Sequence, residues 1–477
     1  MTQPTLLSNL SIDISYKDGS LLLECTPARS KEELANLAPR LHHEMVVDSR
    51  IRRLRLAGMH YRNLILNLQA EQVPFQDHAR DYQNCPTSLQ TPITPRPHQS
   101  AALQKWGEAQ GKGIVVLPTG AGKTVLAVLA MAKVQRSTLI VVPTIDLMNQ
   151  WYEVLQSFFQ VEVGRLGGGE REIKDFTVST YDSAARCSDL LGAKFGFLVI
   201  DECHHLPAPH YQTIAQNCIA PFRLGLTATL ERADGGEALI AELLGEVVYR
   251  GEIHKMTASV LAPYDVITIP VELTPTEREE YTAARERYLT FVRTKRIRMS
   301  APGGWNQFLF QTSLTATGRE AFRAYRTQKK LAQAASAKLE KLWDLLVEHA
   351  NDATIIFTED NTMAYKIART MCLAALTHRT KAKERKQLLE LFRAGTLKTL
   401  VTSKVLNEGV DVPTARVGIV VSGNATVREH VQRLGRILRH SPGKRAVMYE
   451  LIAADTNEQD VNQRRRQHNA YERPTQI

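Results

Sequence analysis

The stretch GIVVLPTGAGKTVLAVLA, residues 113–130, most constrains what this 477-residue chain can fold into. Val115 to Leu117 is apolar and suited to a β-strand, residues 118–122 interrupt that strand, and apolar positions recur at helical spacing from Thr124 onward. Backbone N–H groups of a glycine-rich loop at a helix N-terminus form a cradle for an anion. The pattern therefore predicts a phosphate-binding loop between a strand and a helix.

The residue types in this loop suit a nucleoside triphosphate with Mg²⁺. The candidate phosphate-binding residues are Pro118, Thr119, Gly120, Ala121, Gly122, Lys123 and Thr124. Lys123 is predicted to reach the β- and γ-phosphates of ATP, and Thr124 to bind Mg²⁺. Leu117 stands where such loops usually have their first glycine. A simple glycine turn between packed elements is the alternative.

A second apolar run, in FGFLVIDECHH, ends in two acidic residues. Phe197 to Ile200 is suited to a buried parallel strand, and acids that follow such a strand lie at the edge where open α/β sheets bind ligands. Asp201 is predicted to hold Mg²⁺, and Glu202 to orient and deprotonate the attacking water. The alternative is a pair of acids that only cap a strand.

Composition narrows the class of protein further. The formal charge of +10 and the pI near 9.2 favour an anionic partner. The N-terminus does not resemble a signal peptide, and the sequence contains no apolar run long enough to span a bilayer, so we expect a cytoplasmic protein without a membrane partner. Six cysteines lie far apart with no CxxC pair, which predicts neither disulfides nor a zinc site. We found no nuclease motif.

Four motifs occur in a fixed order. They are PTGAGKT, DECH at 201–204, TAT at 227–229 and QRLGRILR at 432–439. Together they resemble the motif set of superfamily 2 helicases over about residues 96–450, and LGLTATLERAD with EHVQRLGRILRH resembles the XPB-type branch of DNA helicases and translocases. The resemblance implies an α/β fold with two tandem RecA-like domains. It also implies ATP-driven movement on, or unwinding of, single-stranded, forked or branched DNA. An RNA helicase and a nucleic-acid-binding scaffold without productive ATPase activity are the alternatives.

The resemblance implies roles for further residues of the first core. Gln99, in RPHQ, would recognise adenine, although Pro97 also predicts a simple helix start. His204, Thr227 and Thr229 would link hydrolysis to domain movement. Thr144, Ser179 and Thr180 would contact a nucleic-acid strand. Ordinary helix N-caps are the alternative for Thr144 and Ser179. Residues 232–234 are Arg-Ala-Asp where the branch is expected to have Arg-Glu-Asp.

The second core is predicted as another α/β unit. Its expected strands are 354–357, 399–403 and 418–421, with a helix at 384–392. The resemblance makes Gly409 and Asp411 nucleotide contacts. On a helix, the side chains of Gln432, Arg436 and Arg439 share one face. Arginines supplied by a second domain would stabilise charge on the transferring phosphate, which predicts an ATP site in a cleft between the cores. A solvated arginine face is the alternative.

Five segments follow from these assignments. They are an N-terminal accessory domain at 1–90 that could contact DNA, the first core at 91–270, a helical thumb-like insert at 271–330, the second core at 331–460 and a basic tail at 461–477. Arg50 to Arg62 could lie along phosphates or form a solvated edge strand. Arg293 and Arg296 of the insert are candidate DNA contacts, with a plain scaffold as the alternative, and Trp305 is expected in a core. A nuclease or repair protein is a conceivable partner.

Overall fold

The computed structural model describes residues 11–26, 45–48, 53–90, 92–230, 235–251, 264–299, 301, 303–403, 415–422 and 446–459. The chain forms two compact units. One comprises the residues up to Gly251 except the loop 118–121, and the other comprises mainly the residues from Glu252 onward. Within the described residues, no helix has both the length and the hydrophobicity that a membrane crossing needs.

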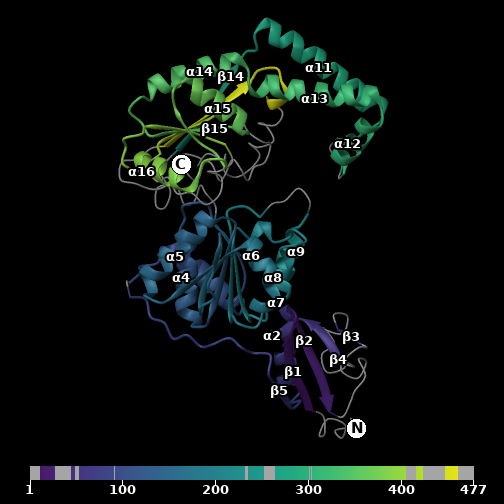
Figure 1. Cartoon of the computed structure of the whole chain (residues 1–477), viewed down its shortest axis with the longest axis vertical. Helices are drawn as coiled ribbons and strands as arrows, with labels where there is room; N and C mark the ends of the chain where they lie inside the picture. The colour runs from purple at the N-terminus through teal and green to yellow at the C-terminus, as the bar shows by residue number, and fades with distance from the viewer. Residues whose placement is uncertain are drawn as a thin grey trace, which may run out of the picture. The chain divides into compact units, whose positions relative to one another are not determined.

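A small five-stranded sheet opens the first unit (Figure 1). In spatial order its strands are β3 (Val46–Asp48), β4 (Arg53–Ala57), β2 (Ser20–Thr26), β1 (Ser11–Lys17) and β5 (Phe75–Asp77). The 3₁₀ turn η2 (Gly58–His60) and helix α2 (Tyr61–Ala70) follow β4. Asp18 and Gly19 both have positive φ, at 50° and 76°, in the turn between β1 and β2. This confirms the hairpin that the Asp-Gly dipeptide predicts.

The structure contradicts one interpretation of the basic segment around β4, the solvated edge strand, while its contact with phosphates stays a prediction. β4 lies between β3 and β2 and so is not an edge strand of the described sheet. Arg53 forms an ion pair with Glu24, and Arg55 Nε donates to Asp48 Oδ2 at 2.9 Å. Both arginines therefore have acidic partners within the sheet.

The larger sheet of the first unit carries the phosphate-binding loop. In spatial order its strands are β13 (Val247–Arg250), β6 (Lys112–Val116), β12 (Phe222–Thr227), β11 (Phe197–Asp201), β7 (Thr138–Val142), β10 (Phe176–Thr180), β8 (Val163–Gly167) and β9 (Glu170–Arg171). All neighbouring strands are parallel except β8 and β9. The central strands are buried along their length, as expected for apolar runs covered on both faces.

Helices cover both faces of this sheet, with α4 and α5 on one side and α6, α8 and α9 on the other (Figure 1). The helices are α3 (Pro97–Glu108), α4 (Lys123–Val134), α5 (Ile145–Phe159), α6 (Tyr181–Arg186), α7 (Ser188–Leu191), α8 (Gln212–Gln216) and α9 (Glu237–Leu244). The turn η3 (Cys203–His205) follows β11. Every parallel strand thus ends at the same edge, where the predicted site residues gather.

The second unit is built on a six-stranded sheet. In spatial order its strands are β14 (Tyr264–Val271), β19 (Ala446–Ala453), β18 (Val417–Val420), β15 (Thr354–Phe357), β17 (Thr399–Thr402) and β16 (Ala374–Leu376), all parallel to their neighbours. Its helices are α14 (Ser336–Glu348), α15 (Asn361–Thr370) and α16 (Ala382–Arg393). The expected strands near 354, 399 and 418 are therefore present. The predicted first-core boundary at residue 270 is wrong, because β14 pairs along its whole length with β19 of the second unit.

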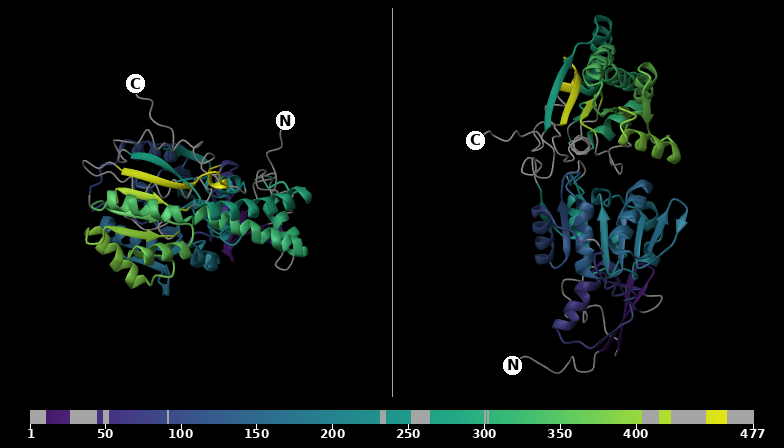
Figure 2. Two further views of the ribbon diagram at one scale, coloured as in Figure 1. Left: turned by 90° about the horizontal axis from the view of Figure 1, so that it is seen from above. Right: turned by 90° about the vertical axis from the view of Figure 1, so that its left-hand side faces the viewer.

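The insert consists of α11 (Pro275–Thr294), α12 (Gly304–Leu314) and α13 (Ala316–Gln333), and α11 lies beside α13 (Figures 1 and 2). Thr274 caps α11 by accepting from the Glu277 N–H at 3.3 Å. Glu277 Oε1 accepts from both the N–H and the hydroxyl of Ser336, each at 3.0 Å. Trp305 is 40% exposed, so its expected core position is wrong. Its ring packs on Phe308 and Tyr325.

Candidate active site

The phosphate-binding loop leaves β6 and enters α4, as the sequence predicts. Gly120 and Gly122 have φ of 87° and 86°, a left-handed conformation that favours glycine. A Cβ on Gly122 would lie 2.4 Å from Gln99 Nε2, so a larger residue there would displace the end of the Gln99 side chain. Leu117 still belongs to the sheet edge, since its N–H donates to the Thr227 carbonyl at 2.9 Å.

Gln99 supports this loop from α3. Its Oε1 accepts from the Arg96 N–H at 2.8 Å, and its Nε2 donates to the Gly122 carbonyl at 3.1 Å. Pro97 begins the helix, so the helix-start interpretation is confirmed. Adenine recognition by Gln99 stays a prediction, although the side chain is only 3% exposed.

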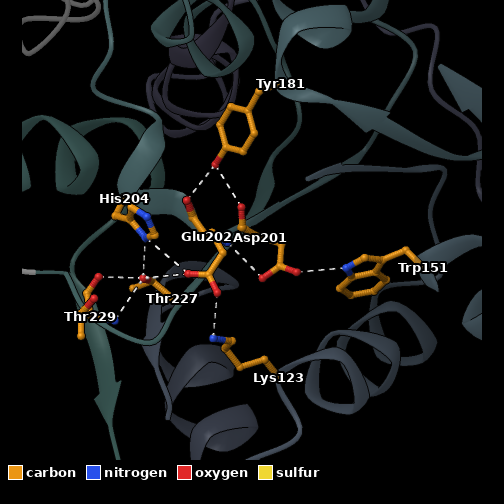
Figure 3. Close-up of polar contacts among 8 residues, drawn as sticks. All are labelled: Lys123, Trp151, Tyr181, Asp201, Glu202, His204, Thr227 and Thr229. Atoms are coloured by element: carbon orange, nitrogen blue, oxygen red, sulfur yellow. Dashed lines mark hydrogen bonds and ion pairs between the residues drawn. The ribbon is translucent and has the colours of Figure 1, made fainter. Parts of the chain in front are cut away.

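The acidic pair lies at the carboxyl edge of β11, next to Lys123 (Figure 3). Lys123 Nζ is 3.2 Å from Glu202 Oε1, with both side chains largely buried. Glu202 has φ of 48°, an uncommon left-handed conformation for a residue with a side chain. Strained backbone of this kind clusters at functional sites.

Electrostatics separate the two carboxyl groups. Burial, and then the negative charge of Glu202, raise the pKa of Asp201 to about 6. Burial by itself also raises the pKa of Glu202, but the Lys123 ammonium and the neighbouring His204 outweigh it and lower that pKa below its ordinary value. Of the two carboxyl groups, Glu202 thus has the lower pKa, and its carboxylate lies beside the Lys123 ammonium.

The coupling candidates form one hydrogen-bonded group on the other side of Glu202 (Figure 3). His204 Nδ1 is 3.0 Å from Thr227 Oγ1 and 3.4 Å from Glu202 Oε2. Thr227 Oγ1 donates to the Thr229 carbonyl at 2.8 Å and also lies 3.4 Å from Glu202 Oε2. These contacts join the end of β12 to the acidic pair, while the coupling role itself stays a prediction.

The residues present fit ATP and Mg²⁺. Lys123 begins a helix of 12 residues directly after the glycine loop, which is the arrangement that binds phosphate. Within the described part of the chain, no group of three or more His, Cys, Asp and Glu side chains could hold a metal ion. Mg²⁺ commonly takes only one or two carboxylates and completes its shell with phosphates and water. Asp201 and the hydroxyl of Thr124 suit that chemistry.

The residues predicted to contact a nucleic-acid strand differ in burial and in hydrogen bonding. Thr144 caps α5, because its Oγ1 accepts from the Leu147 N–H at 3.2 Å. Ser179 is fully buried and its hydroxyl donates to the Leu166 carbonyl at 3.0 Å, which contradicts a contact between its side chain and a strand. Thr180 is 8% exposed and its hydroxyl donates to Ser183 Oγ. Arg293 and Arg296 are exposed at the end of α11. Contacts by the other four residues stay predictions.

The predicted second-core residues lie outside the described residues. They are Gly409, Asp411, Gln432, Arg436 and Arg439. The Arg-Ala-Asp triplet at 232–234 and the basic tail at 461–477 also lie outside the described residues. Their roles stay predictions.

Two aromatic residues that the sequence analysis did not single out contact the acidic pair (Figure 3). Trp151 Nε1 donates to Asp201 Oδ2 at 3.0 Å. The Tyr181 hydroxyl lies 3.0 Å from the Asp201 carbonyl and 3.1 Å from that of Glu202. Trp151 and Tyr181 are 50 and 20 residues from Asp201 in sequence, so no local pattern indicates either contact.

The second unit also contains a cationic cavity that none of the residues predicted from the sequence lines. The cavity has a volume of about 960 Å³ and lies between α13 and the start of α15. Its basic lining residues are Arg323, Arg326, Lys329, Lys330 and Lys366. Of its acidic residues, Glu359 pairs with Lys329 at 2.7 Å, and Asp360 caps α15. The spacing of the basic residues of α13 places them on one helix face, and this pattern in the sequence could have predicted the cavity.

Three family models match the chain. They are the type III restriction enzyme res subunit at residues 92–232, the ERCC3/RAD25/XPB C-terminal helicase at 321–470 and the xeroderma pigmentosum group B helicase damage recognition domain at 14–79. Among solved structures, S. cerevisiae Dbp5 bound to RNA and ADP BeF3 is 15% identical, with a TM-score of 0.56 over 80% of this chain and 88% of that one. This likeness concerns the fold alone, and it agrees with the predicted pair of RecA-like domains.

Curated relatives resemble most of the chain. The DNA 3'-5' translocase XPB2 of Sulfurisphaera tokodaii is 38% identical over 78% of this chain and 84% of that protein. The DNA 3'-5' helicase XPB of Kineococcus radiotolerans is 32% identical over 76% of this chain, which spans 61% of that longer protein. The identity to the first relative and the matched C-terminal helicase model confirm the resemblance of the motifs, and the chain belongs to the XPB family of superfamily 2 DNA helicases and translocases.

Proposed function

We propose that this protein hydrolyses ATP with Mg²⁺ and uses the energy to move along DNA in the 3'-5' direction. The observation that carries the proposal is the meeting of Lys123, Asp201 and Glu202 at one sheet edge, beside the glycine loop. The printed activities of the XPB relatives support DNA as the substrate and supply the polarity.

Each residue of the site has a defined task in this proposal. Lys123 and the loop N–H groups would bind the β- and γ-phosphates, and Thr124 and Asp201 would hold Mg²⁺, which would supply positive charge next to the phosphates. Glu202 accepts the proton of the attacking water. Since the Lys123 ammonium lowers the pKa of Glu202, a Lys123 that turns towards a phosphate leaves Glu202 a stronger base.

The second core would complete the site in this family. We propose that Arg436 and Arg439 stabilise charge on the transferring phosphate, that Gln432 shares their helix face, and that Gly409 and Asp411 contact the nucleotide. Arginines from a second domain make hydrolysis depend on domain closure, and repeated closure moves the nucleic-acid contacts relative to each other.

The cationic cavity is a candidate site for the DNA backbone. Lys329 is paired with Glu359, and the other basic residues, Arg323, Arg326, Lys330 and Lys366, outnumber the remaining acidic residue, Asp360. The cavity adjoins the start of α15, the helix that follows β15 in the chain. A helix N-terminus and several cations favour a polyanion. Because this charge binds any phosphate backbone, RNA remains the alternative substrate.

The proposed function is tested by ATP turnover measured without nucleic acid and with single-stranded DNA, forked DNA or RNA. We expect strong stimulation by DNA and loss of all turnover when EDTA removes Mg²⁺. Stimulation by RNA alone would favour the RNA helicase instead. Turnover in none of these conditions would favour a scaffold without ATPase activity.

Replacing both Arg326 and Lys330 with alanine is expected to weaken DNA binding by roughly tenfold at low salt and to reduce the salt dependence by about one unit of slope per lost phosphate contact. Fluorescence anisotropy with labelled DNA at several salt concentrations measures both quantities. Lys341→Ala is a matched control, since Lys341 is an exposed lysine of α14 outside the cavity. Equal affinities and slopes in the double variant and the control would remove the cavity from the DNA path.

A further inference from the structure

We propose that Trp151 and Tyr181 are positioning residues that connect contact with a DNA strand to the acidic pair Asp201 and Glu202. The inference deepens the proposed function and rests on it, because only an ATPase that responds to DNA needs such a connection. Figure 3 shows the two aromatic side chains approaching the acidic pair from different elements.

Trp151 fixes the carboxylate of Asp201. The indole N–H donates to Oδ2 at 3.0 Å, and the Glu202 N–H donates to Oδ1 at 3.0 Å. Trp151 is 1% exposed and Asp201 6%, so water has little access to either. The terminal torsion of an aspartate is soft, and one donor on each oxygen therefore determines which way the carboxylate faces.

Tyr181 fixes the backbone of the same two residues. Its hydroxyl is within hydrogen-bonding distance of the Asp201 and Glu202 carbonyls, at 3.0 and 3.1 Å, and the side chain is 2% exposed. Glu202 has the uncommon φ of 48°, a conformation that persists only where neighbouring groups hold it. The tyrosine is thus placed to keep the turn that aims the Glu202 side chain towards Lys123.

Both aromatic residues belong to helical segments whose first residues are predicted to contact a DNA strand. Thr144 caps α5 seven residues before Trp151, a helical rise of about 10 Å. Thr180 directly precedes Tyr181 at the start of α6. The strands that lead into these helices, β7 and β10, follow β11 in the sheet order. A DNA strand that binds at the start of α5 or α6 and displaces it would therefore shift a hydrogen-bond donor of the acidic pair, because packed interiors transmit small displacements.

Core packing alone is the competing explanation, and the chain offers a matched control for it. Trp106 is 2% exposed in the same unit, and its indole N–H donates to the Arg223 carbonyl at 2.9 Å. Trp106→Phe and Trp151→Phe each remove one buried indole and one hydrogen bond. Only the second change affects the acidic pair.

The experiment compares full-length wild type, Trp151→Phe, Tyr181→Phe and Trp106→Phe. The first readout is the ratio of ATP turnover with DNA to turnover without it. The second is the dissociation constant of a fluorescent ATP analogue, measured in Mg²⁺ and in EDTA. Partners of metal ligands typically contribute a factor of 10 to 100, so we expect a roughly tenfold lower DNA-stimulation ratio in Trp151→Phe and a smaller fall in Tyr181→Phe. The Mg²⁺-dependent gain in analogue affinity should shrink in Trp151→Phe alone.

The outcomes separate this inference from the proposed function. Wild-type stimulation ratios in both Trp151→Phe and Tyr181→Phe, or an equal loss in Trp106→Phe, would overturn the inference and leave the function standing. A wild-type protein that no DNA stimulates would overturn both. If Trp151→Phe does not fold, Tyr181→Phe decides, since it removes a single hydroxyl and keeps the ring.

Discussion

Replacing Lys123 with alanine is expected to lower DNA-stimulated ATP turnover by roughly 100-fold to 1,000-fold, the usual cost of removing one donor that stabilises charge in a transition state. Lys123 is the first residue of α4, directly after the glycine loop, and its ammonium lies 3.2 Å from Glu202. The substitution removes the only ammonium among the residues assigned to the phosphates. Turnover at saturating ATP and DNA measures the effect.

Lys133→Ala is the matched control, because Lys133 is an exposed lysine in the last turn of the same helix. The control should retain wild-type turnover. Circular dichroism should show the same helix content in both variants, since alanine favours the helix at either position. Turnover in Lys123→Ala within a few-fold of wild type would mean that the ATP site is assigned to the wrong loop.

Arg223→Met is expected to destabilise the first unit by about 3–5 kcal/mol, since an unpaired buried acceptor costs roughly 1–3 kcal/mol. Arg223 lies in β12 and is 2% exposed. Its guanidinium donates to four backbone carbonyls, which belong to Ala215, Cys218, Ala220 and Leu243. These carbonyls come from three segments of the chain, so one side chain joins α8, the loop that follows it and α9 to the start of β12. Calorimetry of the first unfolding transition measures the loss.

Two further variants identify the cause of that loss. Arg223→Lys keeps the charge but offers donors from a single nitrogen, so most of the destabilisation should remain. Arg186→Met changes an exposed arginine of α6 and should stay within about 0.5 kcal/mol of wild type. A stability of Arg223→Met close to that of Arg186→Met would show that the four carbonyls find other donors.

The sequence predicts best what local chemistry determines. The glycine loop, Lys123 and the strand ending in Asp201 are each specified within a few residues, because a phosphate cradle requires glycine at positive φ and a helix directly after it. The parallel sheets follow from apolar runs that alternate with helical patterns. The first-core boundary is missed because β14 pairs with β19, about 180 residues later in the chain.

The side-chain contacts of the site are less predictable. Ser179 has a hydroxyl that could bind a nucleic-acid strand, yet this hydroxyl donates a hydrogen bond within the β-sheet. Trp151 contacts Asp201 only because the sheet order places β7 next to β11, which no short pattern in the sequence encodes. The prediction of a core position for Trp305 is wrong for another reason. An aromatic residue in a helical pattern does not reveal which face of its helix is packed.

The hydrogen bonds from Ser336 to Glu277 join two residues that are 59 positions apart in the chain. Near the same place, Tyr281 of α11 and Ala332 of α13 pack in one hydrophobic cluster with Ala453 of β19. Both ends of the helical hairpin are therefore anchored together on the second unit. A force on the tip of the hairpin would reach the sheet through both ends at once.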